Sequence, residues 1–142
     1  MKEFEAAATI QASPERVWEI ITDGKAYPEF DPSCERVEGE IAVGNKIKVF
    51  SHLSPGRAFP VKVVEMDEAR RMTWQGGMPL GLFRGVRTFT LSPRPDGATD
   101  FRLREVFSGP MLPLISGSLP DMNEAFQGFC EGLKRRAESV GG

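Results

Sequence analysis

The chain has 142 residues, 40% hydrophobic and 27% charged, a balance typical of a folded domain that excludes disorder, collagen and coiled coil. Its 18 basic and 20 acidic residues give a net charge of −2, which predicts no nucleic-acid partner. No apolar run reaches the ~18 residues that a membrane span needs, so we expect no transmembrane segment.

Cysteine and histidine are scarce. Cys34 and Cys130 lack metal-ligand spacing, and the charged N-terminus lacks the apolar core of a signal peptide, so we expect a cytoplasmic protein with free thiols. Cys130 falls among apolar helix positions and is expected to be buried, whereas the place of Cys34 after a proline turn is compatible with exposure. The single histidine, His52, argues against histidine-based centres, and we predict no metal and no cofactor.

The first third of the chain predicts a strand followed by short helices. Residues 4–12 alternate in polarity, as a half-buried strand does. Ser13, Pro14 and Glu15 then supply an N-cap, a proline at the first helical position and an acidic first turn, which predicts a helix over residues 14–22. The prolines in residues 27–32 limit that stretch to a turn or a short second helix.

The middle of the chain predicts six short strands in an antiparallel meander. Glycine, proline, asparagine and aspartate mark the turns between them, and Gly76-Gly77 is one of these predicted turns. The predicted strands span residues 36–40, 46–53, 58–66, 71–75, 83–91 and 99–107.

The last third changes to a helical period. Apolar residues recur at steps of three and four between Ile115 and Ala137, which predicts an amphipathic helix of about twenty residues. Pro113 and Pro120 are expected to limit its start or kink it. Its apolar stripe needs a partner, and the apolar face of the sheet supplies one, so residues 1–142 are interpreted as a single two-layer α+β domain.

One face of the predicted sheet combines apolar residues with one charged pair. A turn near Asp96-Gly97 sets Leu91 opposite Phe101, Phe89 opposite Leu103 and Arg87 opposite Glu105. The arginine and glutamate have two interpretations: a structural ion pair, which the residues alone favour, or a device that orients the polar end of a ligand.

The aromatic residues on this face also have two interpretations. Trp74 and the phenylalanines form an ordinary core, which the pattern favours, or they line a cavity for which the missing side chains of Gly76, Gly77, Gly81 and Gly85 leave room. Tyr27 is interpreted as a surface or rim residue, or as a hydrogen-bond donor to a ligand.

Residues 10–18, which read Ile-Gln-Ala-Ser-Pro-Glu-Arg-Val-Trp, resemble the opening of the START/polyketide-cyclase-like superfamily, often labelled SRPBCC. Residues 22–30, 39–44, 71–74 and 105–109 and the C-terminal helix also fit, so the resemblance covers nearly the whole chain. It implies a helix-grip fold, in which a seven-stranded curved antiparallel sheet surrounds a long C-terminal helix and two short helices follow the first strand.

The resemblance implies a cavity between sheet and helix that accepts a small hydrophobic molecule, aromatic or lipid-like. It identifies no catalytic residue, and the chain lacks the Rieske cysteine–histidine motif of ring-hydroxylating members. The positions that match the general pocket are Phe59, Trp74, Phe83, Arg87, Phe89, Leu103, Glu105 and Phe107 in the sheet and Leu119, Met122, Phe126 and Phe129 in the helix.

Three functions follow from this reasoning. The favoured one is a binding or carrier protein for such a molecule, with Arg87 and Glu105 orienting a polar end. The second is an enzyme of the cyclase or dehydrase type, with proton transfer by Glu105 or His52. The third is a protein-interaction module similar to Hsp90 activators, and the oligomeric state stays open.

Overall fold

The structure of the protein is a computed structural model that describes residues 1–115 and 121–139. The helices and strands are β1 (Lys2–Ile10), α1 (Pro14–Ile21), η1 (Gly24–Ala26), α2 (Tyr27–Phe30), β2 (Cys34–Glu38), β3 (Lys46–Ser51), β4 (Ala58–Asp67), β5 (Arg71–Met78), η2 (Pro79–Gly81), β6 (Phe83–Pro93), β7 (Thr99–Ser108), α3 (Leu112–Ile115) and α4 (Asn123–Glu138).

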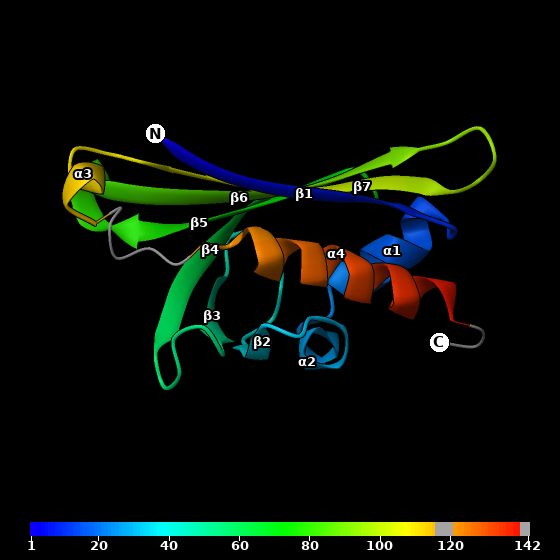
Figure 1. Ribbon diagram of the computed structural model, residues 1–142, viewed down its shortest axis with the longest axis horizontal. Helices are drawn as coiled ribbons and strands as arrows, with labels where there is room; N and C mark the ends of the chain where they lie inside the picture. The colour runs from blue at the N-terminus through cyan, green and yellow to red at the C-terminus, as the bar shows by residue number, and fades with distance from the viewer. Residues whose placement is uncertain (116–120, 140–142) are drawn as a thin grey trace.

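The strands form one antiparallel sheet in the order β1-β7-β6-β5-β4-β3-β2. The sheet curves around α4, which lies along its concave face (Figure 1). The short helices α1 and α2 lie beside α4, whereas α3 lies at the opposite end of the sheet. This is the helix-grip fold that the sequence predicted, with two short helices after the first strand.

Local sequence signals set several of these elements as expected. Ser13 is the N-cap of α1, where its Oγ accepts a hydrogen bond from the Arg16 backbone N–H at 3.2 Å. The β6–β7 hairpin has the predicted register, with Leu91 opposite Phe101, Phe89 opposite Leu103 and Arg87 opposite Glu105.

The long helix begins later than the apolar steps from Ile115 suggested, at a place that fits the expected limit at Pro120. The structure has a four-residue helix, α3, that ends at Ile115, and a separate helix, α4, that begins at Asn123. The Asp121 carboxylate accepts a hydrogen bond from the Asn123 backbone N–H at 2.9 Å, which supplies a local partner at the start of α4. The predicted ligand contact Leu119 lies outside the described residues.

The Gly76-Gly77 turn was also predicted wrongly, because both glycines lie inside β5. Gly76 pairs with Val61 on β4 and with Gly85 on β6. Gly77 has a φ of 130°, and a Cβ there would overlap the carbonyl oxygen of Phe83, so β5 and β6 approach too closely for a side chain. The chain reverses instead at η2.

The middle of α4 forms a solid core with the sheet and α2. Phe129 is at its centre, with ring-centroid distances of 5.1 Å to Phe30 and 6.0 Å to each of Tyr27, Phe89 and Phe101. Edge-to-face and tilted ring pairs of this kind stabilise beyond their buried area by about 0.5–1.5 kcal/mol each.

Both thiols lie in this core. Cys130 is buried as expected, but Cys34 is buried too, which corrects the expectation drawn from the proline turn. Burial raises the pKa of each thiol to about 12, so neither is a reactive nucleophile at neutral pH.

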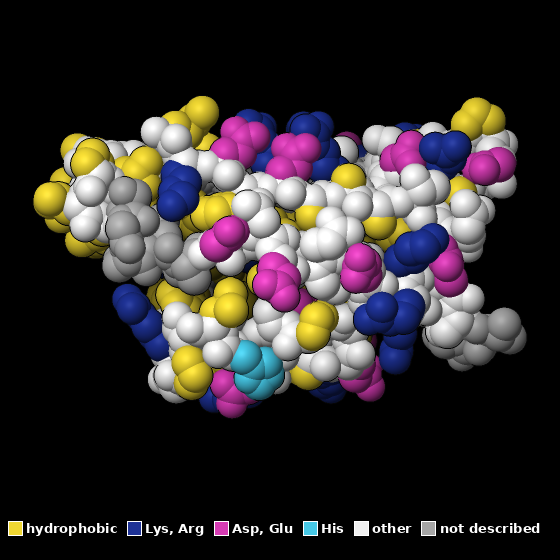
Figure 2. Space-filling model, in the orientation of Figure 1, with side chains coloured by type: hydrophobic (Ala, Val, Ile, Leu, Met, Phe, Trp, Pro, Cys, Tyr) yellow, Lys and Arg dark blue, Asp and Glu magenta, His cyan; other side chains and the backbone are white. Residues whose placement is uncertain are grey.

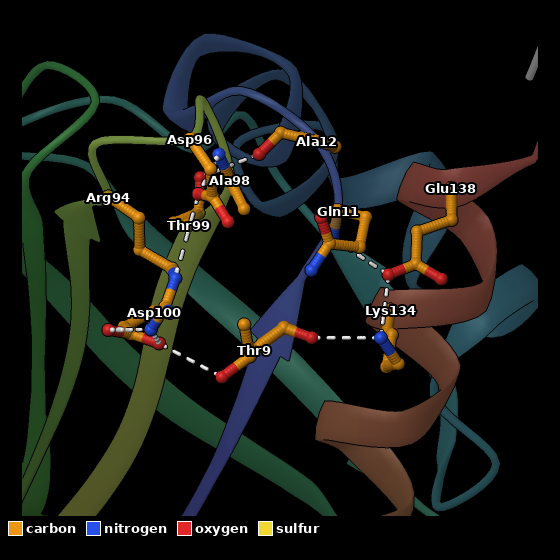
Figure 3. Close-up of polar contacts among 10 residues, drawn as sticks. All are labelled: Thr9, Gln11, Ala12, Arg94, Asp96, Ala98, Thr99, Asp100, Lys134 and Glu138. Carbon is orange, nitrogen blue, oxygen red and sulfur yellow. Dashed lines mark hydrogen bonds and ion pairs between the residues drawn. The ribbon is translucent and has the colours of Figure 1, made fainter.

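Polar contacts fasten the end of α4 to the edge of the sheet (Figure 3). The Lys134 ammonium donates to the Thr9 carbonyl at 2.8 Å and to the Glu138 carboxylate at 2.7 Å. Glu138 also accepts from the Gln11 backbone N–H at 2.7 Å, and Thr9 Oγ1 donates to Asp100 in β7 at 3.0 Å. These bonds hold the C-terminal end of α4 against β1. Among the described residues, no such hydrogen bond joins the N-terminal end of α4 to the sheet, so that end is the less constrained one.

The closest approach of α4 to α2 is at Gly132, where a Cβ would overlap the Phe30 carbonyl oxygen. We expect Gly132→Ala to lower the free energy of unfolding by about 2 kcal/mol or more, since backbone must move. Gly128→Ala is the matched control. The new Cβ would meet only a side-chain atom, Pro32 Cγ, at 3.2 Å, and alanine is favoured over glycine in a helix by about 1 kcal/mol. Urea unfolding of both variants tests this, and equal effects would contradict the packing described.

Candidate ligand-binding site on the concave face

The predicted ligand contacts divide into two groups by exposure. Four of them form the floor of the concave face and are 0–2% exposed, namely Trp74, Phe89, Leu103 and Phe129. These side chains are closely packed between the sheet and α4. They leave no space for a ligand there unless they move.

The remaining described contacts surround the less constrained end of α4. Phe107 and Phe126 are buried, whereas Phe83, Arg87, Glu105 and Met122 are half-buried. Phe59, at 37% exposure, lies at the rim beside Val49 of β3. A molecule on the concave face therefore has access to this second group first.

The glycines leave room at the end of the sheet, but not over the middle of the concave face. A Cβ on Gly85 would meet the ring of Phe107 at 3.0 Å, and a Cβ on Gly76 would meet Val61 Cγ1 at 2.9 Å. Neighbouring side chains fill both positions. A hollow of about 460 Å³ lies at the end of β4, β5 and β6, and its lining includes Gly76, Gly77 and Gly81 together with Val61 and Phe83.

Arg87 and Glu105 carry the charge on this otherwise apolar face. Arg87 Nε donates to Glu105 Oε1 at 2.7 Å, and the two side chains are 23% and 12% exposed. The guanidinium carbon is 5.0 Å from the centroid of the Phe126 ring, within cation–π range. Burial disfavours the charged guanidinium, but the Glu105 carboxylate outweighs it, so the pKa of Arg87 is raised.

Asp31 is a second acid near Arg87, and the sequence reasoning did not identify it. It is 5% exposed, and its Oδ1 accepts from Ser33 N at 3.0 Å and Ser33 Oγ at 2.9 Å. Burial raises the pKa of Asp31, while these hydrogen bonds and the positive charge of Arg87 lower it in part. The Asp-Pro-Ser order is typical of an Asx turn, but no local pattern places it near β6.

Trp74 adds an unused hydrogen-bond donor to the same region. Its side chain lies opposite Arg87 across β5 and β6 and packs on Phe89, with ring centroids 4.8 Å apart. Its Nε1 is buried and has no hydrogen-bond partner among the described residues. Leaving such a donor unsatisfied costs about 1–3 kcal/mol, but Trp74 belongs to the packed floor, so a ligand oxygen could reach Nε1 only if that floor opened.

The comparison with protein families gives a match over nearly the whole chain. Residues 1–138 match the family described as polyketide cyclase / dehydrase and lipid transport. The chain belongs to this family. A search of curated proteins finds no match.

Solved structures of similar fold cover nearly the whole chain of this family member. A Mesorhizobium loti protein is 20% identical, with a TM-score of 0.72 and coverage of 94% of this chain and 95% of that one. A START superfamily protein from Mycobacterium smegmatis is 17% identical, with a TM-score of 0.69 and coverage of 96% and 97%. The Aha1 dimer of Colwellia psychrerythraea is 21% identical, with a TM-score of 0.73 and coverage of 100% of each chain. At these identities the likeness shows the fold alone.

Two other residues considered from the sequence are Tyr27, whose ring stacks on Trp74 with centroids 5.8 Å apart, and His52. Tyr27 is buried, and its hydroxyl donates to the Ile21 carbonyl at 2.6 Å, so it is a structural residue rather than a rim residue. His52 is exposed in the turn after β3, remote in register from Glu105. Across residues 1–115 and 121–139 there is no metal-ligand cluster and no helix able to span a membrane.

The buried Asp31 predicts a specific pH dependence of stability. Its pKa is raised in the folded state, so the unfolded chain loses this proton first and the contribution of Asp31 to stability falls as pH rises. Asp31→Asn keeps an acceptor for Ser33 and removes the titration. We expect the wild type to lose stability relative to Asp31→Asn as pH rises above about 4, the ordinary Asp value, and through the raised pKa. Urea unfolding across pH measures this difference, and a difference that moves the opposite way would contradict it.

Proposed function

We propose that the chain binds a small hydrophobic molecule with a polar or acidic end on the concave face of the sheet. The observation that carries the proposal is the half-buried Arg87–Glu105 pair within an otherwise apolar surface. The family, described as polyketide cyclase / dehydrase and lipid transport, supports a hydrophobic ligand in general.

The apolar part of the molecule would lie over half-buried side chains next to this charged pair. Phe83 stacks on Phe107, with ring centroids 5.6 Å apart and planes at 10°, and presents its other face. Val61 and Met122 are likewise only partly covered and pack against the core. Covering these surfaces would supply affinity at roughly 25 cal/mol per Å² of apolar area removed from water.

The polar end of the molecule would lie at Arg87. The guanidinium donates from Nε to Glu105, and its terminal nitrogens have no hydrogen bond to another described side chain. A carboxylate or hydroxyl on the ligand would accept from them in a charge-assisted bond worth about 1.5–3 kcal/mol. Glu105 and Asp31 keep the guanidinium in place and offset its charge when the site is empty.

Catalysis by a cyclase or dehydrase mechanism is the second candidate, because the family description includes both activities. Glu105 is the acid that lies on the concave face, and its Oε1 is engaged by Arg87 at 2.7 Å. That engagement favours an orienting role over proton transfer, so we place binding first.

We expect Arg87→Met to weaken binding of pyrenedecanoic acid by about 10–100-fold and to change binding of decylpyrene, which lacks the acid, by less than about threefold. Methionine keeps an apolar stem against Phe126, so the loss reports the charge. Fluorescence titration of both probes measures the two affinities.

Arg104→Ala is the matched control, because Arg104 pairs with Glu3 on the outer face of the same sheet and should leave both affinities unchanged. Equal losses for acid and hydrocarbon in Arg87→Met would contradict the orienting role. Failure of wild-type protein to bind either probe would contradict the proposed function.

A further inference from the structure

An apolar tip projects from the end of the sheet where α3 lies. We define the tip as Met78, Leu80 and Leu82 at the β5–β6 turn together with Leu114 of α3, which are 42%, 96%, 39% and 77% exposed. Figure 2 shows hydrophobic side chains gathered at this end of the molecule. Single exposed leucines are common on proteins, but four large apolar residues on one projection mark an interaction surface.

The tip is a built feature, because its two segments are bonded to each other. The Met111 backbone N–H donates to the Leu82 carbonyl at 2.9 Å. Gly109, with a φ of 112°, allows this approach, since a Cβ there would lie 2.6 Å from the Leu82 carbonyl oxygen. Leu80 itself has a φ of 60°, a conformation that leucine adopts at a cost, and it points no apolar surface into the core.

The surface next to the tip is positive. The hollow of about 460 Å³ at the end of β4, β5 and β6 includes Pro79, Leu80 and Gly81 of the tip in its wall. Its lining also contains three cations and no carboxylate among the described residues, the cations being Lys46, Lys62 and Arg84.

The cations beside the tip differ from three arginines elsewhere on the sheet. Arg71, Arg102 and Arg104 are each paired with a glutamate on a neighbouring strand. Lys46, Lys62 and Arg84 have no ion-pair partner in residues 1–115 and 121–139, so their charge is uncompensated locally. An anionic partner would supply the compensation.

We propose that the tip docks the protein on a membrane surface that contains anionic lipid. Leu80 and Leu114, the two most exposed residues of the tip, can enter the boundary between headgroups and acyl chains. The neighbouring cations can then contact anionic headgroups. The tip adjoins Phe83 at the open end of the concave face, so docking would bring that end to the lipid. The inference does not depend on which molecule the concave site binds.

Vesicle flotation tests the proposal with the full chain and no added ligand. We expect binding to vesicles of phosphatidylcholine mixed with phosphatidylglycerol, and much weaker binding to phosphatidylcholine alone. The double variant Leu80→Ser with Leu114→Ser should lower the affinity for the anionic vesicles at least about tenfold. Lys46→Ala and Lys62→Ala should each lower it about fivefold.

Val43→Ser is the matched control, because Val43 is 59% exposed and lies outside the tip, in the β2–β3 connection. It should bind like the wild type. Circular dichroism melting of every variant verifies that each is folded.

A dye on the introduced thiol of Leu80→Cys gives a second readout, since Cys34 and Cys130 are buried and should remain unlabelled. We expect its emission to shift to the blue on anionic vesicles. Three results would overturn the proposal: no vesicle binding by the wild type, unchanged binding by the double leucine variant, or a change in oligomeric state of that variant with vesicle binding unaffected. The last result would assign the tip to contact between copies of the chain.

Discussion

The helix α4 is shorter than the strands it covers, and the rest of the structure follows from this mismatch. Its 16 residues span about 24 Å, whereas the 11 residues of β6 extend about 36 Å. Because Lys134 and Glu138 fasten the C-terminal end of α4 to β1, α4 does not reach the other end of the sheet. One half of the concave face is therefore a packed core, and the other is left to half-buried residues.

The charged pair lies at the boundary between these halves. Arg87 lies two residues before Phe89 in β6, on the same concave face, so it is located where the fully buried floor ends. A lone buried guanidinium would be prohibitively unfavourable, and Glu105 directly opposite makes its position tolerable. An apolar pair would serve the core at least as well, so the retention of charge there fits a ligand better than it fits packing.

Most of the fold could be predicted from the sequence because its signals are local. The cap at Ser13, the turn at Asp96-Gly97 and the alternation along β6 and β7 each fix structure within a few residues. The start of α4 was placed too early because the apolar steps of three and four continue from Ile115 into the helix, although residues 121 and 122 directly before α4 are not helical.

The site was less predictable because it depends on contacts between distant segments. The same alternation places Phe89 and Phe83 on one face of β6. Only the position of α4 makes Phe89 a core residue and leaves Phe83 half-buried. Asp31 lies near enough to Arg87 to interact with its charge because α2 packs on the sheet, and no spacing in the chain reveals this. The glycines gave a mixed signal: Val61 and Phe107 fill the space beside Gly76 and Gly85, whereas Gly76, Gly77 and Gly81 line the hollow at the end of the sheet.

Nuclear magnetic resonance of the two indole groups tests the central claim most directly. The chain contains only Trp18 and Trp74, so a ¹⁵N-tryptophan sample gives two indole N–H signals, and Trp74→Phe assigns them. On titration with decanoic acid, the Trp74 signal should shift saturably because Trp74 lies opposite Arg87 on the neighbouring strand, while the signal of Trp18 on α1 stays in place. An unmoved Trp74 signal at saturation would contradict binding on the concave face beside Arg87.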